Sequence, residues 1–221
     1  MNDSNRDEIY ESLMLSTFSK HQMHYFAVKR VLDIIVSLIG IICLSWLFLI
    51  AAIAVKLQDG GPVLFKQVRI GRHGKHFEIY KFRSMKVGSH EVHADYDEEE
   101  DKISKVDQDD RITFVGKFLR KTSIDELPQL FNIFKGEMSL IGPRAFMAHD
   151  LQKMSEFNGE LKLLVPQGLT GAWQVYKGRH DLSAEETTNV ELKYVNNFGF
   201  KQDIKIFFQT FIVLFKFGHQ Q

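Results

Sequence analysis

The longest apolar stretch of the chain runs from residue 34 to residue 55 without a formally charged side chain. Asp33 precedes this run and Lys56 follows it. As a helix rising about 1.5 Å per residue, the run would extend roughly 33 Å, enough to cross the hydrocarbon core of a bilayer. A fully buried core helix of a soluble domain is the alternative, but uncharged runs of this length are typical of membrane segments.

Basic residues flank this run on both sides, so the positive-inside rule does not select a single crossing. A helix that enters and leaves on the same side would satisfy the rule, provided that a break reverses its direction. Gly40 and Ser45 are the candidate break positions. The pattern therefore favours a re-entrant helix and leaves a spanning one open. The flanking cations are Lys20, Lys29 and Arg30 before the run and Lys56, Lys66, Arg69 and Arg72 after it.

A second apolar stretch covers residues 203–217 and carries Lys201, Lys205 and Lys216 at its margins. It is too short to span a bilayer comfortably. An apolar face bordered by lysines predicts an interfacial helix. Packing of this helix against the core of the domain is the competing interpretation.

Residues 63–70 and 77–83, between these stretches, read as two strands around a glycine-bearing loop at residues 71–74, which predicts a β-hairpin. In the second strand, Lys81 and Arg83 alternate with aromatic residues, so both cations are expected on one face of the hairpin. Ordinary exposed charges on an edge strand are the alternative.

The pattern turns helical after residue 111, and residues 122–130 then bring two adjacent carboxylates, Asp125 and Glu126. Ser123 and Glu126 have the spacing of a capping box, and Pro128 fits only near a helix start. The carboxylates are therefore expected in a first helical turn, where free N–H groups favour anions. Ordinary helix capping, with no chemistry, is the alternative.

Two further segments carry groups suited to phosphate. Residues 139–143 predict an extended run into a tight turn that presents Arg144, and guanidinium groups bind phosphate oxygens in pairs. Residues 166–179 contain three glycines together with Gln174 and Arg179. This second segment suits a nucleotide loop, although a plain glycine-rich turn would have the same composition.

The composition adds an uneven distribution of charge. The 221-residue chain, long enough for one substantial core, has a formal net charge of zero. Residues 91–110 nevertheless hold ten acids and two lysines, which leaves a basic remainder of +8. A basic body with an acidic loop suits an anionic substrate or membrane surface, and no nucleic-acid partner is expected. The single Cys43 excludes an intrachain disulfide and favours a reducing compartment, and no signal peptide is expected.

Several motifs, in one order from about Lys29 to Phe217, resemble a known family, the bacterial sugar transferases. These are monotopic polyprenyl-phosphate phosphoglycosyl transferases. The motifs are KRVLDIIVSLIG, GGPVLFKQVRIGRHGKHFEIYKFRSM, DDRITFVGKFLRKTSIDELPQLFNIFKGEMSLIGPR and GLTGAWQVYKGR. The resemblance implies a small membrane-associated α+β fold with amphipathic interfacial helices. Taken with the patterns above, the expected parts are a loose, polar N-terminal tail (1–28), a membrane-embedded helix (29–57) and a catalytic domain (58–221) with an acidic loop at 91–110.

The resemblance also implies an activity. Members of this family transfer a sugar 1-phosphate from a UDP-sugar to undecaprenyl phosphate, release UMP, and so begin the synthesis of a surface polysaccharide. They act through a covalent phosphosugar-aspartate with Mg²⁺, at the cytoplasmic face of the bacterial inner membrane. The apolar surface leaves room for a homo-oligomer. No residue identifies the sugar, so glucose, galactose and N-acetylated sugars all remain open.

By position, Asp125 matches the nucleophile of the family and Glu126 its acidic partner and Mg²⁺ ligand. The remaining matches are to groups that bind the nucleotide phosphates or surround the active site: Arg120, Arg144, Lys81, Arg83, Gln174 and Arg179. Three features depart from the family pattern: Trp46 and Ala145 stand where the family usually has proline, and the last motif reads P-Q-G and Y-K-G-R, as if single residues were inserted. They keep open a second interpretation, a catalytically weak, membrane-anchored binding or regulatory relative.

Overall fold

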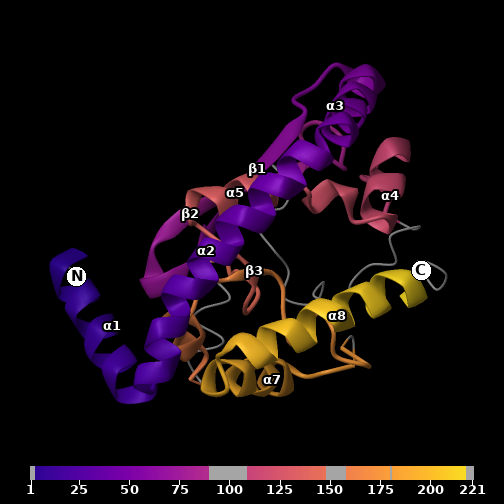
Figure 1. The fold of residues 1–221 in the computed structure, drawn as a ribbon. Helices are drawn as coiled ribbons and strands as arrows, with labels where there is room; N and C mark the ends of the chain where they lie inside the picture. The colour runs from indigo at the N-terminus through magenta and orange to yellow at the C-terminus, as the bar shows by residue number, and fades with distance from the viewer. Residues whose placement is uncertain (1–2, 90–108, 148–157, 180, 218–221) are drawn as a thin grey trace.

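A computed structural model describes residues 3–89, 109–147, 158–179 and 181–217 (Figure 1). The predicted acidic loop at 91–110 lies outside these residues except for Asp109 and Asp110. Helices dominate and the strands form two small sheets, which confirms the predicted α+β class. In Figure 1, α2 and α3 run along one side of the molecule, α7 and α8 run along another, and β3 lies between them.

The N-terminal segment is helical, and the prediction of a loose polar tail is wrong for these residues. Helix α1 spans Asp3–Thr17 and α2 spans Lys20–Cys43, with Ser19 and Gln22 forming a capping box between them. Met14 and Phe18 are buried in the main core. The sequence gives little sign of this packing, because few apolar residues of α1 face the protein and polar residues surround them.

The long apolar run is divided between two helices. Helix α3 spans Ser45–Asp59, and its axis is bent by 62° from that of α2 at Leu44. Within the described residues, no single helix has the length and hydropathy of a membrane span, whereas α2 and α3 meet that test together. The break falls beside Ser45, one of the two predicted positions, and needs no proline. Gly40, the other, instead lets the side chain of Leu130 approach α2 closely.

Helix α2 has an inverted distribution of polarity. Its buried positions recur every four residues and are Tyr25, Lys29, Asp33 and Ser37, three of them strongly polar. Its outward positions are apolar and exposed, as are those of α3; they include Val31, Ile35, Ile39, Ile42, Trp46, Leu49 and Ile53. An apolar stripe normally faces the core of a soluble protein. The opposite arrangement here leaves the apolar faces of these two helices uncovered within the described part of the chain.

The predicted hairpin is confirmed: β1 (Leu64–Ile70) pairs with β2 (His76–Phe82) in antiparallel register around the short 3₁₀ helix η1 (Arg72–Gly74). A second sheet joins β3 (Ser139–Ile141) to β4 (Gly168–Thr170) in parallel. Gly142 directly follows β3 and lies very close to the chain segment before β4. A Cβ atom at residue 142 would be 2.1 Å from the carbonyl oxygen of Pro166. Glycine at position 142 is thus a packing requirement.

The remaining elements enclose these sheets. They are α4 (Phe114–Lys121), η4 (Ile124–Glu126), α5 (Gln129–Lys135), η5 (Gly159–Leu164), α7 (Ala184–Asn196) and α8 (Phe200–Phe217). Asp203, near the start of α8, is buried and accepts hydrogen bonds from the hydroxyl groups of Tyr25 at 2.8 Å and Tyr194 at 2.7 Å. Its carboxylate also pairs with the ammonium group of Lys29. This polar cluster attaches α8 to α2 and α7.

Candidate active site

A cavity of about 1120 Å³ opens between the hairpin, η4, the β3–β4 sheet and α8. Residues far apart in the sequence meet in its wall. Seven of the eight predicted site residues line it: Lys81, Arg120, Asp125, Glu126, Arg144, Gln174 and Arg179. The structure therefore gathers the predicted carboxylates and nearly all of the predicted cations around one space.

The two carboxylates lie on η4, a single turn of 3₁₀ helix, and the predicted capping box is absent. Ser123 adopts a left-handed conformation (φ 55°) and makes no side-chain cap. Its carbonyl oxygen accepts a hydrogen bond from the backbone N–H of Glu126 at 3.2 Å. In a 3₁₀ helix with about three residues per turn, adjacent side chains point roughly 120° apart. Asp125 and Glu126 therefore face different surroundings. Pro128 does stand at a helix start, as predicted, at the N-cap of α5.

The surroundings of the two carboxylates push their pKa values in opposite directions. Burial raises the pKa of Asp125, which is 8% exposed, to about 6, and the negative charge of Glu126 adds to this rise. Burial would also raise the pKa of Glu126, but the ammonium of Lys81, with Arg144 and Arg179, outweighs burial and lowers it. The Lys81 Nζ–Glu126 Oε1 distance is 2.8 Å. Pairs of acids with separated pKa values are typical of sites that assign each acid a different role.

Arg120 reaches the cavity from the last turn of α4 and is oriented by a residue that the sequence did not single out. Its Nε donates to the hydroxyl of Ser84 at 2.8 Å. The backbone carbonyl oxygen of Ser84 in turn accepts from the backbone N–H of Thr113, the N-cap of α4, at 3.0 Å. Ser84 thus connects the end of the hairpin to both ends of α4. The only sequence signal for this role is a small polar residue directly after the second strand.

Arg144 and Arg179 stand near the ring of Trp173, with guanidinium carbons 5.2 and 6.0 Å from its centroid. Stacking of guanidinium groups on an aromatic face holds their planes in place. The main chain at Arg144 is held as well, because its N–H donates to the carboxylate of Glu191 on α7. Neither Trp173 nor Glu191 was among the residues predicted from the sequence. Trp173 lies inside the glycine-bearing motif, whereas Glu191 reads as an ordinary helix residue.

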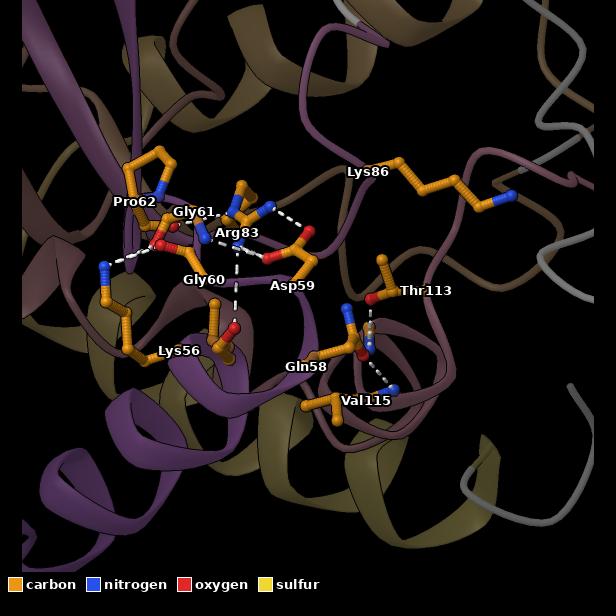
Figure 2. A network of polar contacts seen from close by, with 12 residues as sticks. Lys56, Gln58, Asp59, Gly60, Gly61, Pro62, Arg83, Lys86, Thr113 and Val115 are labelled. Atoms are coloured by element: carbon orange, nitrogen blue, oxygen red, sulfur yellow. Dashed lines mark hydrogen bonds and ion pairs between the residues drawn. The ribbon is translucent and has the colours of Figure 1, made fainter.

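Arg83 does not reach the cavity, and its predicted place beside Lys81 needs correction. Its guanidinium turns to the end of α3, where it pairs with the carboxylate of Asp59 and donates to the carbonyl oxygen of Pro62 at 2.6 Å (Figure 2). Arg83 follows the last residue of β2, so the strict alternation of a strand no longer directs its side chain. Arg83 therefore fastens α3 to the hairpin, and its side chain is buried.

The carboxylates also decide which metal the site suits. Within the described parts of the chain, no group of three or more His, Cys, Asp and Glu side chains is arranged to hold a metal ion. Mg²⁺ commonly binds to one or two carboxylates and completes its coordination with substrate phosphate oxygens and water. Glu126 beside Asp125, facing a cation-lined cavity, fits that donor set, whereas a metal site formed by protein ligands alone does not.

A buried acid, a second acid of lowered pKa and several cations around one cavity form a site that suits a phosphorylated, anionic ligand. Comparison with known families identifies the class of protein. Residues 24–217 match the bacterial sugar transferase family, and the chain belongs to it. The resemblance seen in the sequence motifs is thereby confirmed.

Similar proteins carry names consistent with this family. Over 189 residues the chain is 41% identical to the undecaprenyl-phosphate galactose phosphotransferase of Salmonella typhimurium, covering 82% of this chain and 39% of that protein. It is 36% identical to the galactosyl transferase CpsE of Streptococcus agalactiae, covering 95% of this chain and 47% of that protein. The chain thus spans less than half the length of these two relatives. The chain is 38% identical to the exopolysaccharide production protein ExoY of Sinorhizobium fredii, and the match covers 82% of this chain and 83% of that protein.

Proposed function

We propose that this protein transfers a sugar 1-phosphate from a UDP-sugar to undecaprenyl phosphate with release of UMP, as the first membrane step of surface polysaccharide synthesis. The observation that carries the proposal is a buried Asp125 beside a Lys81-paired Glu126, in a cavity whose other charged lining residues are all cations. The names of the relatives support both the phosphorylated donor and the lipid phosphate acceptor.

In the first step, a carboxylate oxygen of Asp125 attacks the β-phosphorus of the UDP-sugar. A new bond forms between this oxygen and phosphorus, and the bond from the β-phosphorus to the oxygen bridging the two phosphates breaks. The bridging oxygen leaves with its electron pair as part of UMP. A phosphosugar remains attached to Asp125 as an acyl phosphate. With a pKa of about 6, Asp125 is mostly ionised at neutral pH and is the stronger base of the two acids.

In the second step, an oxygen of the lipid phosphate attacks the same phosphorus atom. The bond between phosphorus and Asp125 breaks, and the carboxylate is regenerated with its electron pair. The product is a sugar attached to the lipid through a diphosphate. Asp125 is thus the nucleophile of the first displacement and the leaving group of the second, and it is regenerated for the next turnover.

The cations have a common task, since a diphosphate repels an attacking carboxylate unless its charge is neutralised. Arg120, Arg144 and Arg179 line the cavity and are proposed to bind the phosphate oxygens of donor and acceptor. Bound Mg²⁺, held by Glu126 and phosphate oxygens, would supply further neutralisation of charge. Lys81 keeps Glu126 ionised and therefore able to serve as a metal ligand.

We infer the membrane location from the exposed apolar faces. Helix α4 also exposes apolar side chains, since Phe114 is 89% exposed. A bent helix pair whose two ends lie on the cytoplasmic side would place these faces in lipid and the cavity near the headgroups. Single cysteines replacing the exposed Lys20 and Lys66 test this placement in a Cys43→Ser background. Both are expected to resist an impermeant thiol reagent added outside intact cells, and labelling of only one would indicate a true crossing.

The activity is tested with purified protein in lipid nanodiscs, Mg²⁺, undecaprenyl phosphate and a panel of UDP-sugars. The native protein is expected to release UMP with at least one donor, whereas Asp125→Asn is expected to release none. Without lipid acceptor, peptide mass spectrometry is expected to find a phosphosugar adduct on Asp125. Equal UMP release by both proteins with every donor, or an adduct on another residue, would contradict the proposal. Complete absence of UMP release would favour the binding or regulatory relative.

A further inference from the structure

The cavity that holds the carboxylates has a second, chemically different wall. The charged groups lie on the hairpin, in and just before α4, on η4, in the turn after β3 and in the loop after β4, whereas α8 contributes the side chains of Phe207, Thr210, Phe211 and Val213. The rings of Phe207 and Phe211 lie 4.9 Å apart and pack edge to face. The part of the cavity wall formed by α8 is therefore largely apolar, and it lines the same cavity as the cations.

Helix α8 is held in this position at two points. Near its start, buried Asp203 bonds to Tyr25, Tyr194 and Lys29. Near the middle of α8, the hydroxyl of Thr210 lies 2.8 Å from that of Thr170 at the end of β4. The aromatic wall is therefore fixed relative to the β3–β4 sheet and to the Arg144 turn that follows β3.

The two exposed sides of α8 differ in what they face. Phe207 and Phe211 line the cavity, whereas Phe208 and Ile212 are absent from its lining and are 61% and 52% exposed. Residues 207 and 211 are one helical turn apart and share a face. The chain thus offers matched aromatic positions on α8, one inside the cavity and one outside it.

We infer that the wall formed by Phe207 and Phe211 binds the first isoprenoid units of the lipid phosphate acceptor, with the phosphate directed toward Asp125 and the cavity cations. A UDP-sugar is polar along its length, and its phosphate, ribose and uracil groups need hydrogen-bond partners. Phenyl rings do not provide such partners. A lipid phosphate has one anionic end and one hydrocarbon end, which matches a cavity lined by cations and by the phenyl rings of α8. This inference rests on the proposed function and deepens it by locating the acceptor.

The test separates the two half-reactions. Phe207→Ser and Phe211→Ser are compared with Phe208→Ser, which removes the same side chain from outside the cavity. The first measurement is UMP release in a single turnover without acceptor. The second is the rate at which the isolated phosphosugar-enzyme is discharged by undecaprenyl phosphate at subsaturating concentration. Removal of either cavity phenylalanine is expected to slow discharge about tenfold and to leave UMP release within twofold of the native rate.

Acceptor length gives an internal control. With methyl phosphate, which has no isoprenoid, the cavity variants are expected to be discharged at the native rate. A loss of UMP release in the cavity variants alone would show that the wall binds the donor sugar, and would overturn the inference. An equal loss of discharge in Phe208→Ser would overturn it too, because that outcome indicates a general effect of α8 on the membrane or on stability.

A binding measurement keeps the inference independent of turnover. The native protein and the three variants, each verified by thermal unfolding, are titrated with farnesyl phosphate in nanodiscs. Phe207→Ser and Phe211→Ser are expected to weaken binding at least fivefold, and Phe208→Ser less than twofold. Unchanged binding in all three variants would overturn the inference. If the native protein releases no UMP with any donor, the proposed function fails, and this titration still decides whether the wall binds an isoprenoid phosphate.

Discussion

The carboxylate of Glu191 holds the main chain of Arg144: its Oε1 accepts a hydrogen bond of 2.8 Å from the Arg144 N–H. Its other oxygen, Oε2, lies 2.6 Å from the Nζ of Lys162, and both side chains are almost fully buried. A residue of α7 thus fixes the turn that presents a cation to the cavity, although Glu191 does not line the cavity itself.

Glu191→Gln is expected to destabilise the protein and loosen the Arg144 turn. Removing one partner of a buried ion pair leaves an uncompensated charge on Lys162 and costs about 3 kcal/mol. For a chain of this size, that loss lowers the melting temperature by roughly 6–12 °C. The KM for the UDP-sugar is expected to rise several-fold, with a smaller effect on kcat.

The double variant Glu191→Gln, Lys162→Met is the control for this prediction. It removes both charges and retains an amide oxygen for the Arg144 N–H, so most of the lost stability should return. Unchanged melting temperature and KM in the single variant would contradict a positioning role for Glu191.

Asp125→Asn is expected to stabilise the metal-free protein while abolishing activity. Folding raises the pKa of Asp125 from 3.8 to about 6, so the folded state retains its proton in a pH range where the unfolded state has lost it. Stability of the native protein relative to Asp125→Asn therefore falls as pH rises from about 4 to about 6 and is constant above that. A shift of about two pKa units corresponds to about 3 kcal/mol.

The measurement is urea unfolding of both proteins at several pH values in buffer with chelator. Glu126→Gln is a comparison with the opposite sign, since the pKa of Glu126 is lowered by folding. A difference between native protein and Asp125→Asn that does not vary with pH would contradict the buried, pKa-raised state of Asp125.

Arg83 and Arg144 are expected to differ in the kind of damage that their loss causes. Arg83→Gln removes the contacts with Asp59 and Pro62 that fasten α3 to the hairpin, so the melting temperature should fall. The KM for the UDP-sugar, measured on protein that remains folded, should stay within twofold. Arg144→Gln should raise that KM about tenfold or more, with little effect on the melting temperature, because its side chain is exposed in the cavity. A large rise in KM for Arg83→Gln, with a fall in melting temperature for Arg144→Gln instead, would contradict this prediction and place Arg83 in the active site.

Gly116→Ala is expected to destabilise α4 and displace Arg120. A Cβ atom at residue 116 would lie 1.9 Å from the backbone carbonyl oxygen of Ser84, which cannot move as a flexible side chain would. Overpacking of this kind costs on the order of 3 kcal/mol. Gly199→Ala is the matched control, since its Cβ would meet its nearest neighbour at 3.9 Å. Thermal unfolding of both variants decides the matter, and equal melting temperatures would contradict the predicted close contact.

Local patterns predicted the local structure well. The alternation and the glycine loop of residues 63–83 specified the hairpin, and the order of the motifs brought the carboxylates together with most of the predicted cations. The pattern failed where a side chain's direction depends on distant partners. Arg83 follows the strand and turns to Asp59, and Ser123 takes a left-handed conformation that excludes the cap its spacing suggests.

Other features had no local signal at all. Glu191 is recognisable only once α7 packs beside the Arg144 turn, and Ser84 only once α4 is in place. Met14 of α1 and Phe18, which directly follows α1, are buried in a cluster that includes residues more than 100 positions away, among them Phe198. Contacts of that range follow from tertiary packing and leave no periodic trace in a single sequence.

The pairing of Lys29 with Asp203 also constrains the order in which parts of the protein can fold during synthesis. The two residues are 174 positions apart, and the polar face of α2 has this late residue as its principal anionic partner among the described contacts. During synthesis, Lys29 and Tyr25 therefore emerge long before the carboxylate that they require. Contacts of high sequence separation form slowly and only after the intervening chain has been made. A nascent chain that stops before α8 lacks the carboxylate that pairs with Lys29 and accepts a hydrogen bond from Tyr25, so this buried polar cluster can form only after the start of the last helix has been made.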